Sequence, residues 1–175
     1  VGYPNRDEER EIITRQLDPV APDVRPIITP QRIEEARKVL SEIYVDDKVK
    51  EYILDIVLAT REPEKVKGLG RDFARLVEYG ASPRASLALV KAGRSLALLR
   101  GRAYVLPQDV FDVAPEILRH RLVLTYEALA QDIDTAAVVT RILSTVPAPR
   151  VTPSQSNGAA DAYHGAVTDA VAWPS

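Results

Sequence analysis

The residues best suited to chemistry in this chain are Ser82, Pro83 and Arg84, which together have the pattern of a helix start. Serine is a favoured N-cap, and proline suits the first helical position, where its missing N–H costs nothing. Arg84 then falls in the first turn, where the macrodipole disfavours a cation by roughly 0.3–1 kcal/mol. A guanidinium beside free backbone N–H groups suits a phosphate instead. Arg84 is therefore a candidate phosphate-binding residue, with Ser82 as a possible second contact.

The ordinary alternative for Arg84 is a surface ion pair with a carboxylate such as Glu78 or Asp72. Lys91 lies two turns along the same predicted helical face and is a further candidate for contact with the anion. Together with Arg94 it could also line a subunit interface, although solvated surface cations are the commoner case. The sequence leaves these alternatives open.

Composition excludes several classes of function. The 175 residues carry a formal net charge of −2, so any basic function must come from a local patch. There is no cysteine, and the two histidines, His120 and His164, lie far apart, so we predict no metal site. No signal peptide opens the chain and no apolar run approaches the about 18 residues that span a bilayer, so we expect a cytoplasmic protein without membrane contact. The chain starts at Val1 and lacks methionine, which removal of an initiator methionine or a cut from a longer polypeptide would explain equally well; we favour the cut.

Proline residues and apolar spacing predict an all-α fold, a bundle of five to six helices followed by a disordered C-terminal tail. A charged helix should run from Pro4 or Asn5 to about Gln16, and prolines make the following segment, 17–29, an extended linker. Five further helices should start at Pro30 after a Thr29 cap, at Asp46 or Asp47, at Pro83, at Pro107 and at about Asp134. Residues 72–79 could form a short helix or irregular structure.

Apolar residues at helical spacing predict which faces of these helices are buried. The second helix should bury Ile33, Ala36, Leu40 and Ile43, and the third Val49, Ile53, Ile56 and Val57. The helix that starts at Pro83 should end near Arg100, stopped by Gly101. Its expected buried face consists of Ala85, Leu89, Ala92, Leu96 and Leu99, and its opposite cationic strip of Arg84, Lys91 and Ser95.

The segment from Gly80 to Val110, GASPRASLALVKAGRSLALLRGRAYVLPQDV, followed by LRHRLVL, resembles the C-terminal lid domain of MoxR-family AAA+ ATPases. The opening VGYPNRDEER is similar to the join between the last core strand of such an ATPase and its lid. The resemblance spans about Val1 to Pro147, and it implies three parts. Residues 1–28 would hold the end of a core strand, a connecting helix and the linker, residues 29–146 the helical lid, and residues 147–175 the disordered tail.

The same resemblance implies a parent protein with an ATP-hydrolysing core immediately N-terminal to Val1, which binds ATP and Mg²⁺. The parent would assemble into a homo-oligomeric ring, typically a hexamer, and do chaperone-like remodelling or maturation of protein complexes, often with proteins that carry von Willebrand factor A domains. Arg84 matches the family's sensor 2 arginine, which reports on the terminal phosphate of the nucleotide. Ser82 and Lys91 are possible further contacts to the nucleotide.

Two departures from the family pattern stand out. No glycine is followed by Lys-Ser or Lys-Thr, so the chain has no P-loop, and we predict that it binds no cofactor and hydrolyses no ATP alone. The family's usual hydroxyl residue before the helix at Pro107 is Leu106 here, which removes a side-chain cap worth about 1 kcal/mol.

A second hypothesis is a stand-alone helical interaction module, possibly a nucleic-acid binder. Its candidate contacts are the cations of the central segment, Arg84, Lys91, Arg94, Arg100 and Arg102. The negative net charge and the absence of a recognised nucleic-acid motif disfavour this hypothesis.

Overall fold

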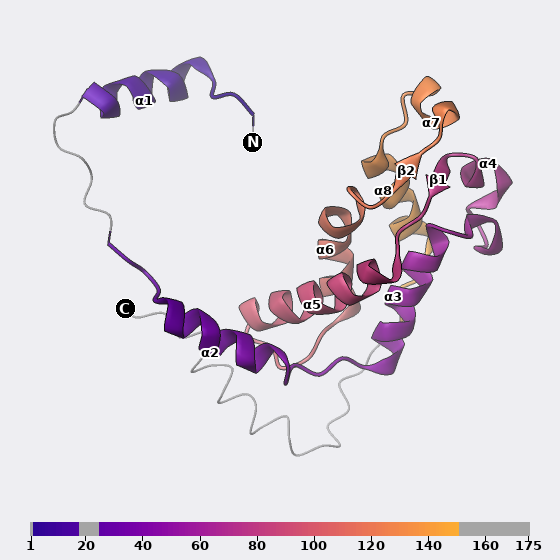
Figure 1. The fold of residues 1–175 in the computed structure, drawn as a ribbon, viewed down its shortest axis with the longest axis horizontal. Helices are drawn as coiled ribbons and strands as arrows, with labels where there is room; N and C mark the ends of the chain where they lie inside the picture. Colours follow the sequence, from indigo (N-terminus) through magenta and orange to yellow (C-terminus); the bar gives the residue numbers. More distant parts are fainter. Residues whose placement is uncertain (1, 18–24, 151–175) are drawn as a thin grey trace. The chain divides into compact units, whose positions relative to one another are not determined.

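The computed structural model describes residues 2–17 and 25–150, and the chain divides into two compact units, residues 1–33 and 34–175. The described residues form α-helices, one 3-10 helix and a two-stranded sheet (Figure 1), so the predicted all-α class is confirmed. The part of the predicted linker at 18–24 and the tail beyond residue 150 lie outside the described residues.

Helix α1, Arg6–Leu17, matches the predicted charged helix and starts after Asn5. The Asn5 side chain accepts hydrogen bonds from the N–H groups of Asp7 and Glu8, both at 3.0 Å, and the Glu8 carboxylate accepts one from the Asn5 N–H at 2.8 Å. This reciprocal capping satisfies the first free donors of the helix. Every residue of α1 is exposed.

Helix α2, Pro30–Leu40, starts where predicted, and the Thr29 hydroxyl accepts a hydrogen bond from the Arg32 N–H at 3.3 Å. Its predicted buried face is only partly correct. Ile33 is 41% exposed, whereas Ile43 is buried at 1% exposure. Because α2 ends at Leu40 and the chain turns there, Ile43 does not continue the helical face and reaches the core from beyond the helix.

Helix α3, Asp47–Ala59, is capped by Asp46, whose carboxylate accepts a hydrogen bond from the Lys48 N–H at 2.8 Å. The four side chains predicted to point inward are all buried: Val49, Ile53, Ile56 and Val57. Pro63 does not extend α3 but opens the 3-10 helix η1, Pro63–Lys65. The sequence therefore predicted α3 with its cap and its buried face.

A small substructure was mostly missed by the sequence analysis. It comprises helix α4, Gly70–Ala74, strands β1, Val77–Tyr79, and β2, Val123–Leu124, and helix α7, Tyr126–Ala130. A short helix was one of the two alternatives for residues 72–79, and α4 overlaps the start of that range, whereas residues 77–79 form a strand. The strands pair antiparallel, with Val77 opposite Leu124 and Tyr79 opposite Val123. Figure 1 shows these elements gathered at one end of the unit that starts at Glu34. Elements of two to five residues are too short to show a hydrophobic period, which explains why the sequence pattern missed them.

Helix α5, Pro83–Leu99, ends within one residue of the predicted Arg100, which is its C-cap, and Gly101, with a φ of 68°, follows as the predicted stop. The predicted leucine face is partly wrong, since Leu99 is 69% exposed while Gly93 and Ala97 are buried with Ala85 and Leu89. The buried face differs from the predicted one because α5 approaches Val105 closely at Gly93. A Cβ at residue 93 would lie 3.2 Å from the Cγ1 of Val105. The buried face of α5 therefore combines small residues with Leu89 and Leu98.

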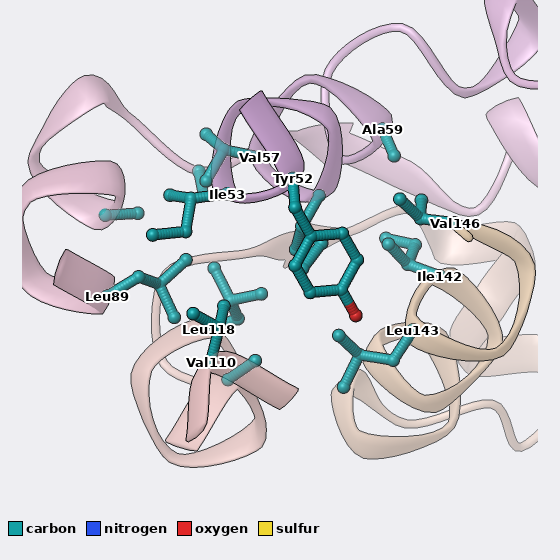
Figure 2. Packing of buried hydrophobic residues seen from close by; sticks show 14 of the residues in the cluster. Tyr52, Ile53, Val57, Ala59, Leu89, Val110, Leu118, Ile142, Leu143 and Val146 are labelled. Atoms are coloured by element: carbon teal, nitrogen blue, oxygen red, sulfur yellow. The ribbon is translucent and has the colours of Figure 1, made fainter. Parts of the chain in front are cut away.

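Helices α6, Pro107–Leu118, and α8, Thr135–Thr145, complete the unit. Leu106 has no side-chain acceptor, but the Asp109 carboxylate accepts a hydrogen bond from the Leu106 N–H at 2.8 Å, which offsets the missing cap. Asp134 caps α8 by accepting from the Ala137 N–H at 2.7 Å. The core lies between α3, α5, α6 and α8, and Figure 2 shows Ile53, Leu89, Val110 and Ile142 converging there.

Candidate functional site

The loop before α5 is fixed to the C-terminal end of α3. The buried Ala81 donates its N–H to the Thr60 hydroxyl at 2.9 Å and accepts a hydrogen bond from the Arg61 Nε at 2.6 Å. Thr60, itself 1% exposed, donates its hydroxyl to the Val57 carbonyl at 2.6 Å. These contacts set where α5 begins, and so they set the position of Arg84.

Gly80 is required by the same contact. A Cβ at residue 80 would lie 2.4 Å from the Thr60 carbonyl oxygen, well inside the distance that two such atoms tolerate. Since the obstacle is backbone, no side-chain rotation could relieve it. The glycine before the Ser-Pro-Arg sequence was a signal that the sequence analysis left unused.

Arg84 is exposed in the first turn of α5 and makes no ion pair or hydrogen bond with any residue that the structure describes. The alternative partners, Glu78 and Asp72, do not pair with it. Ser82 occupies the N-cap position, as predicted, but its side chain makes no capping hydrogen bond. A free guanidinium thus stands beside a helix start without a side-chain cap, an arrangement that can receive a phosphate.

The other predicted members of the site lie further along α5. Lys91 is exposed on the same face as Arg84, but seven residues separate their Cα atoms by about 10 Å along the helix axis. Ser95 is half-buried and donates its hydroxyl to the Lys91 carbonyl at 3.0 Å. Ser82 and Arg84 thus both lie at the start of α5, whereas Lys91 lies two turns away.

Arg100 and Arg102 serve a different purpose, which the sequence analysis missed. Arg102 donates to both oxygens of the fully buried Asp109, at 2.7 and 2.5 Å, and Arg100 donates to Asp109 at 2.8 Å and to Asp112 at 2.6 Å. Burial alone would raise the pKa of Asp109, but hydrogen bonds from Arg102 and the Leu106 N–H outweigh it and lower the pKa. Two of the five cations assigned to nucleic-acid binding are thus committed to the corner between α5 and α6.

Other kinds of site find no support in the part of the chain that the structure describes. No three residues of the metal-binding types come together within residues 2–17 and 25–150. Over the same ranges, every helix is too short or too polar to cross a bilayer.

Comparison with known proteins identifies the family. A model of the AAA lid domain matches residues 72–142. Chaperone MoxR1 of Mycobacterium tuberculosis is 44% identical over 158 residues, which are 90% of this chain and 41% of the chaperone. Protein MoxR of Paracoccus denitrificans is 36% identical over 119 residues, 65% of this chain and 34% of that protein.

A solved structure supports the same family assignment. The crystal structure of a protein assigned as an ATPase from Cytophaga hutchinsonii superposes with a TM-score of 0.77 at 32% identity, over 86% of this chain and 45% of that one. The chain spans less than half the length of these relatives. The helical fold around α5 and these likenesses together show that the chain belongs to the lid domains of the MoxR family of AAA+ ATPases.

Proposed function

We propose that this chain is the sensor 2 lid of a MoxR-type AAA+ ATPase and couples ATP binding and hydrolysis in the parent ring to remodelling or maturation of protein complexes. The observation that carries the proposal is Arg84, a guanidinium free of described partners at a fixed and uncapped helix start. The guanidinium and the free N–H groups of the helix start both suit a phosphate group. The described residues offer no carboxylate cluster for Mg²⁺, so the ATPase core would hold the metal.

Arg84 would contact the terminal phosphate of the nucleotide only when the lid is closed. A charge-assisted hydrogen bond from its guanidinium to the terminal phosphate is worth roughly 1.5–3 kcal/mol. A contact of that size shifts the equilibrium between an open and a closed lid by about one to two orders of magnitude. Because the loop at Ala81 fixes α5 to α3, movement of Arg84 toward the phosphate would carry the whole helical unit with it. Loss of the phosphate after hydrolysis would release the lid.

The wider expectations from the family resemblance belong to the same proposal. Residues 29–146 would be the lid, and residues 1–28 would join it to an ATPase core. The part of MoxR1 that this chain does not match is long enough to hold such a core. Ring assembly, its hexameric size, partners with von Willebrand factor A domains and a cytoplasmic location stay predictions. So does the inactivity of this chain alone, which we expect because the sequence has no P-loop.

The test is the substitution Arg84→Ala in the full-length parent protein. We expect ATP turnover to fall by an order of magnitude or more, since the contact to the terminal phosphate is lost. Steady-state ATPase assays measure the fall, and the unfolding transition of the variant lid should match that of the wild type. Arg71→Ala is a matched control, because Arg71 is exposed on α4 and also lacks a described partner. Unchanged turnover in Arg84→Ala would remove this residue from the mechanism.

A further inference from the structure

One face of α5 carries four residues at spacings of three, four and three: Arg84, Leu87, Lys91 and Arg94. At 100° per residue these side chains fall within about 80° of one another. Leu87 is 63% exposed, and Arg84 and Lys91 are exposed as well. This face of α5 is therefore open to a partner and continues directly from the candidate phosphate site.

Arg94 differs from an ordinary surface cation. It is half-buried, and its Nε is shielded from water without a hydrogen-bond partner among the described residues. No described carboxylate pairs with it, and Lys50, another cation, lies close enough to interact with it electrostatically. Lys50 is itself paired with Asp47 at 2.7 Å. A partly desolvated guanidinium beside a like charge is unfavourable unless an anion compensates it.

The surroundings of Arg94 have the composition of a protein interface. Tyr44, 61% exposed, lies close enough to interact electrostatically with Lys50. Tyrosine and arginine are enriched at interface cores, where arginine is often among the residues that contribute most to binding. We define the Arg94 face as Leu87, Lys91 and Arg94 of α5 together with Lys50 and Tyr44.

We propose that the Arg94 face is a docking surface for the ATPase core, and that a carboxylate of the core pairs with the Arg94 guanidinium. The inference rests on the proposed function, because the body that presents a phosphate to Arg84 must approach this same side of α5. Two observations select that occupant: the continuity of the face with Arg84, and the unpaired positive charge that a carboxylate complements. The matched relatives also extend well beyond this chain, which covers 41% of MoxR1.

The experiment uses the full-length parent with Arg94→Gln, and the probe is the β,γ-imido analogue of ATP. The variant should bind the analogue about tenfold more weakly at ~50 mM salt, because the closed lid loses a charge-assisted contact. The difference should shrink at ~500 mM salt, but less than for a fully exposed ion pair, because the half-buried Arg94 is screened less. Arg71→Gln, which removes an exposed cation of α4, should stay within about twofold of wild type.

A second measurement separates docking from a structural role. In urea unfolding, the 175-residue chain with Arg94→Gln should be at least as stable as wild type, because an uncompensated charge has been removed. Arg94→Gln binding within twofold of wild type, while Arg84→Ala loses turnover, would overturn the docking surface and leave the proposed function standing. If neither substitution has an effect, the proposed function fails as well. Loss of lid stability in Arg94→Gln would also overturn the inference.

Discussion

The two ends of α5 carry the same type of side chain in opposite situations. Past its C-terminal end, Arg100 and Arg102 converge on the buried Asp109, and Arg100 also reaches Asp112. At its N-terminal end, Arg84 contacts no described partner at all. The helix macrodipole favours cations at the C-terminal end and disfavours them at the N-terminal end. The fold thus accounts for Arg100 and Arg102, whereas for Arg84 it offers no stabilising partner.

This difference separates a structural arginine from a candidate functional one. The pairs around Asp109 fix the corner between α5 and α6, and they hold the pKa of Asp112 below its usual range through hydrogen bonds from Arg100 and Gln108. Arg84 is equally well positioned, since its helix start is fixed to α3, but nothing within the described chain uses its charge. This contrast is the reason that we propose a partner outside the chain for Arg84.

The largest effect is expected at the C-terminal end of α5, from the substitution Asp109→Ala. This substitution leaves two guanidinium groups without their shared buried carboxylate and removes the acceptor for the Leu106 N–H. We expect a loss of about 3 kcal/mol in the free energy of unfolding, at the low end for a broken buried pair. The low end applies because Arg102 and Arg100 keep 19% and 41% of their side-chain surface exposed.

Urea denaturation of the chain measures this loss, and Asp112→Ala is the matched control. Asp112 accepts from the same Arg100 but keeps 30% of its side-chain surface exposed, so its removal should cost less than about 1 kcal/mol. Equal losses in the two variants would mean that burial of Asp109 does not set the strength of this corner.

Gly80→Ala tests how the other end of α5 is held. The added Cβ would meet the Thr60 carbonyl oxygen at 2.4 Å, so the loop must move away from α3. We expect a loss of about 1–3 kcal/mol, as for other overpacked sites. In the full-length parent, turnover should also fall because Arg84 moves with the loop.

Gly93→Ala is the comparison variant for this prediction. Its Cβ meets only the Val105 Cγ1, at 3.2 Å and within a helix, where alanine is favoured over glycine by about 0.8–1 kcal/mol. The two terms nearly offset each other, so thermal unfolding should show a change within about 1 kcal/mol. A Gly80→Ala chain as stable as the Gly93→Ala chain would show that the contact with Thr60 does not position α5.

The sequence predicted the parts of this fold that depend on local rules. Asp46, one of the two candidates for the cap of α3, is the cap, α8 starts directly after Asp134 as expected, and Gly101 follows the end of α5. The start of α5 at Pro83 follows from the same rules. Arg84 was found in the same way, as a residue that violates a local preference.

What the sequence could not predict depends on contacts between distant segments. The Arg100–Asp109 pairs join residues nine apart across a corner, and the contact of Ala81 with Thr60 spans 21 residues. The buried face of α5 was misjudged because hydrophobic spacing favours leucines, whereas the close approach to Val105 requires glycine at residue 93. Contacts between residues that are distant in the sequence leave no periodic pattern in a single sequence.

Arg84→Glu is expected to change the free energy of unfolding least of these variants. It separates an effect on folding from an effect on ATP turnover. An acidic residue in the first turn of α5 interacts favourably with the macrodipole, and no described contact of Arg84 is lost. The free energy of unfolding of the chain should therefore rise by about 0.3–1 kcal/mol, measured by urea denaturation at low salt. ATP turnover of the full-length variant should fall at least as far as in Arg84→Ala, because a carboxylate repels the phosphate. A destabilised Arg84→Glu chain would mean that Arg84 supports the fold, and the contrast between the two ends of α5 would then disappear.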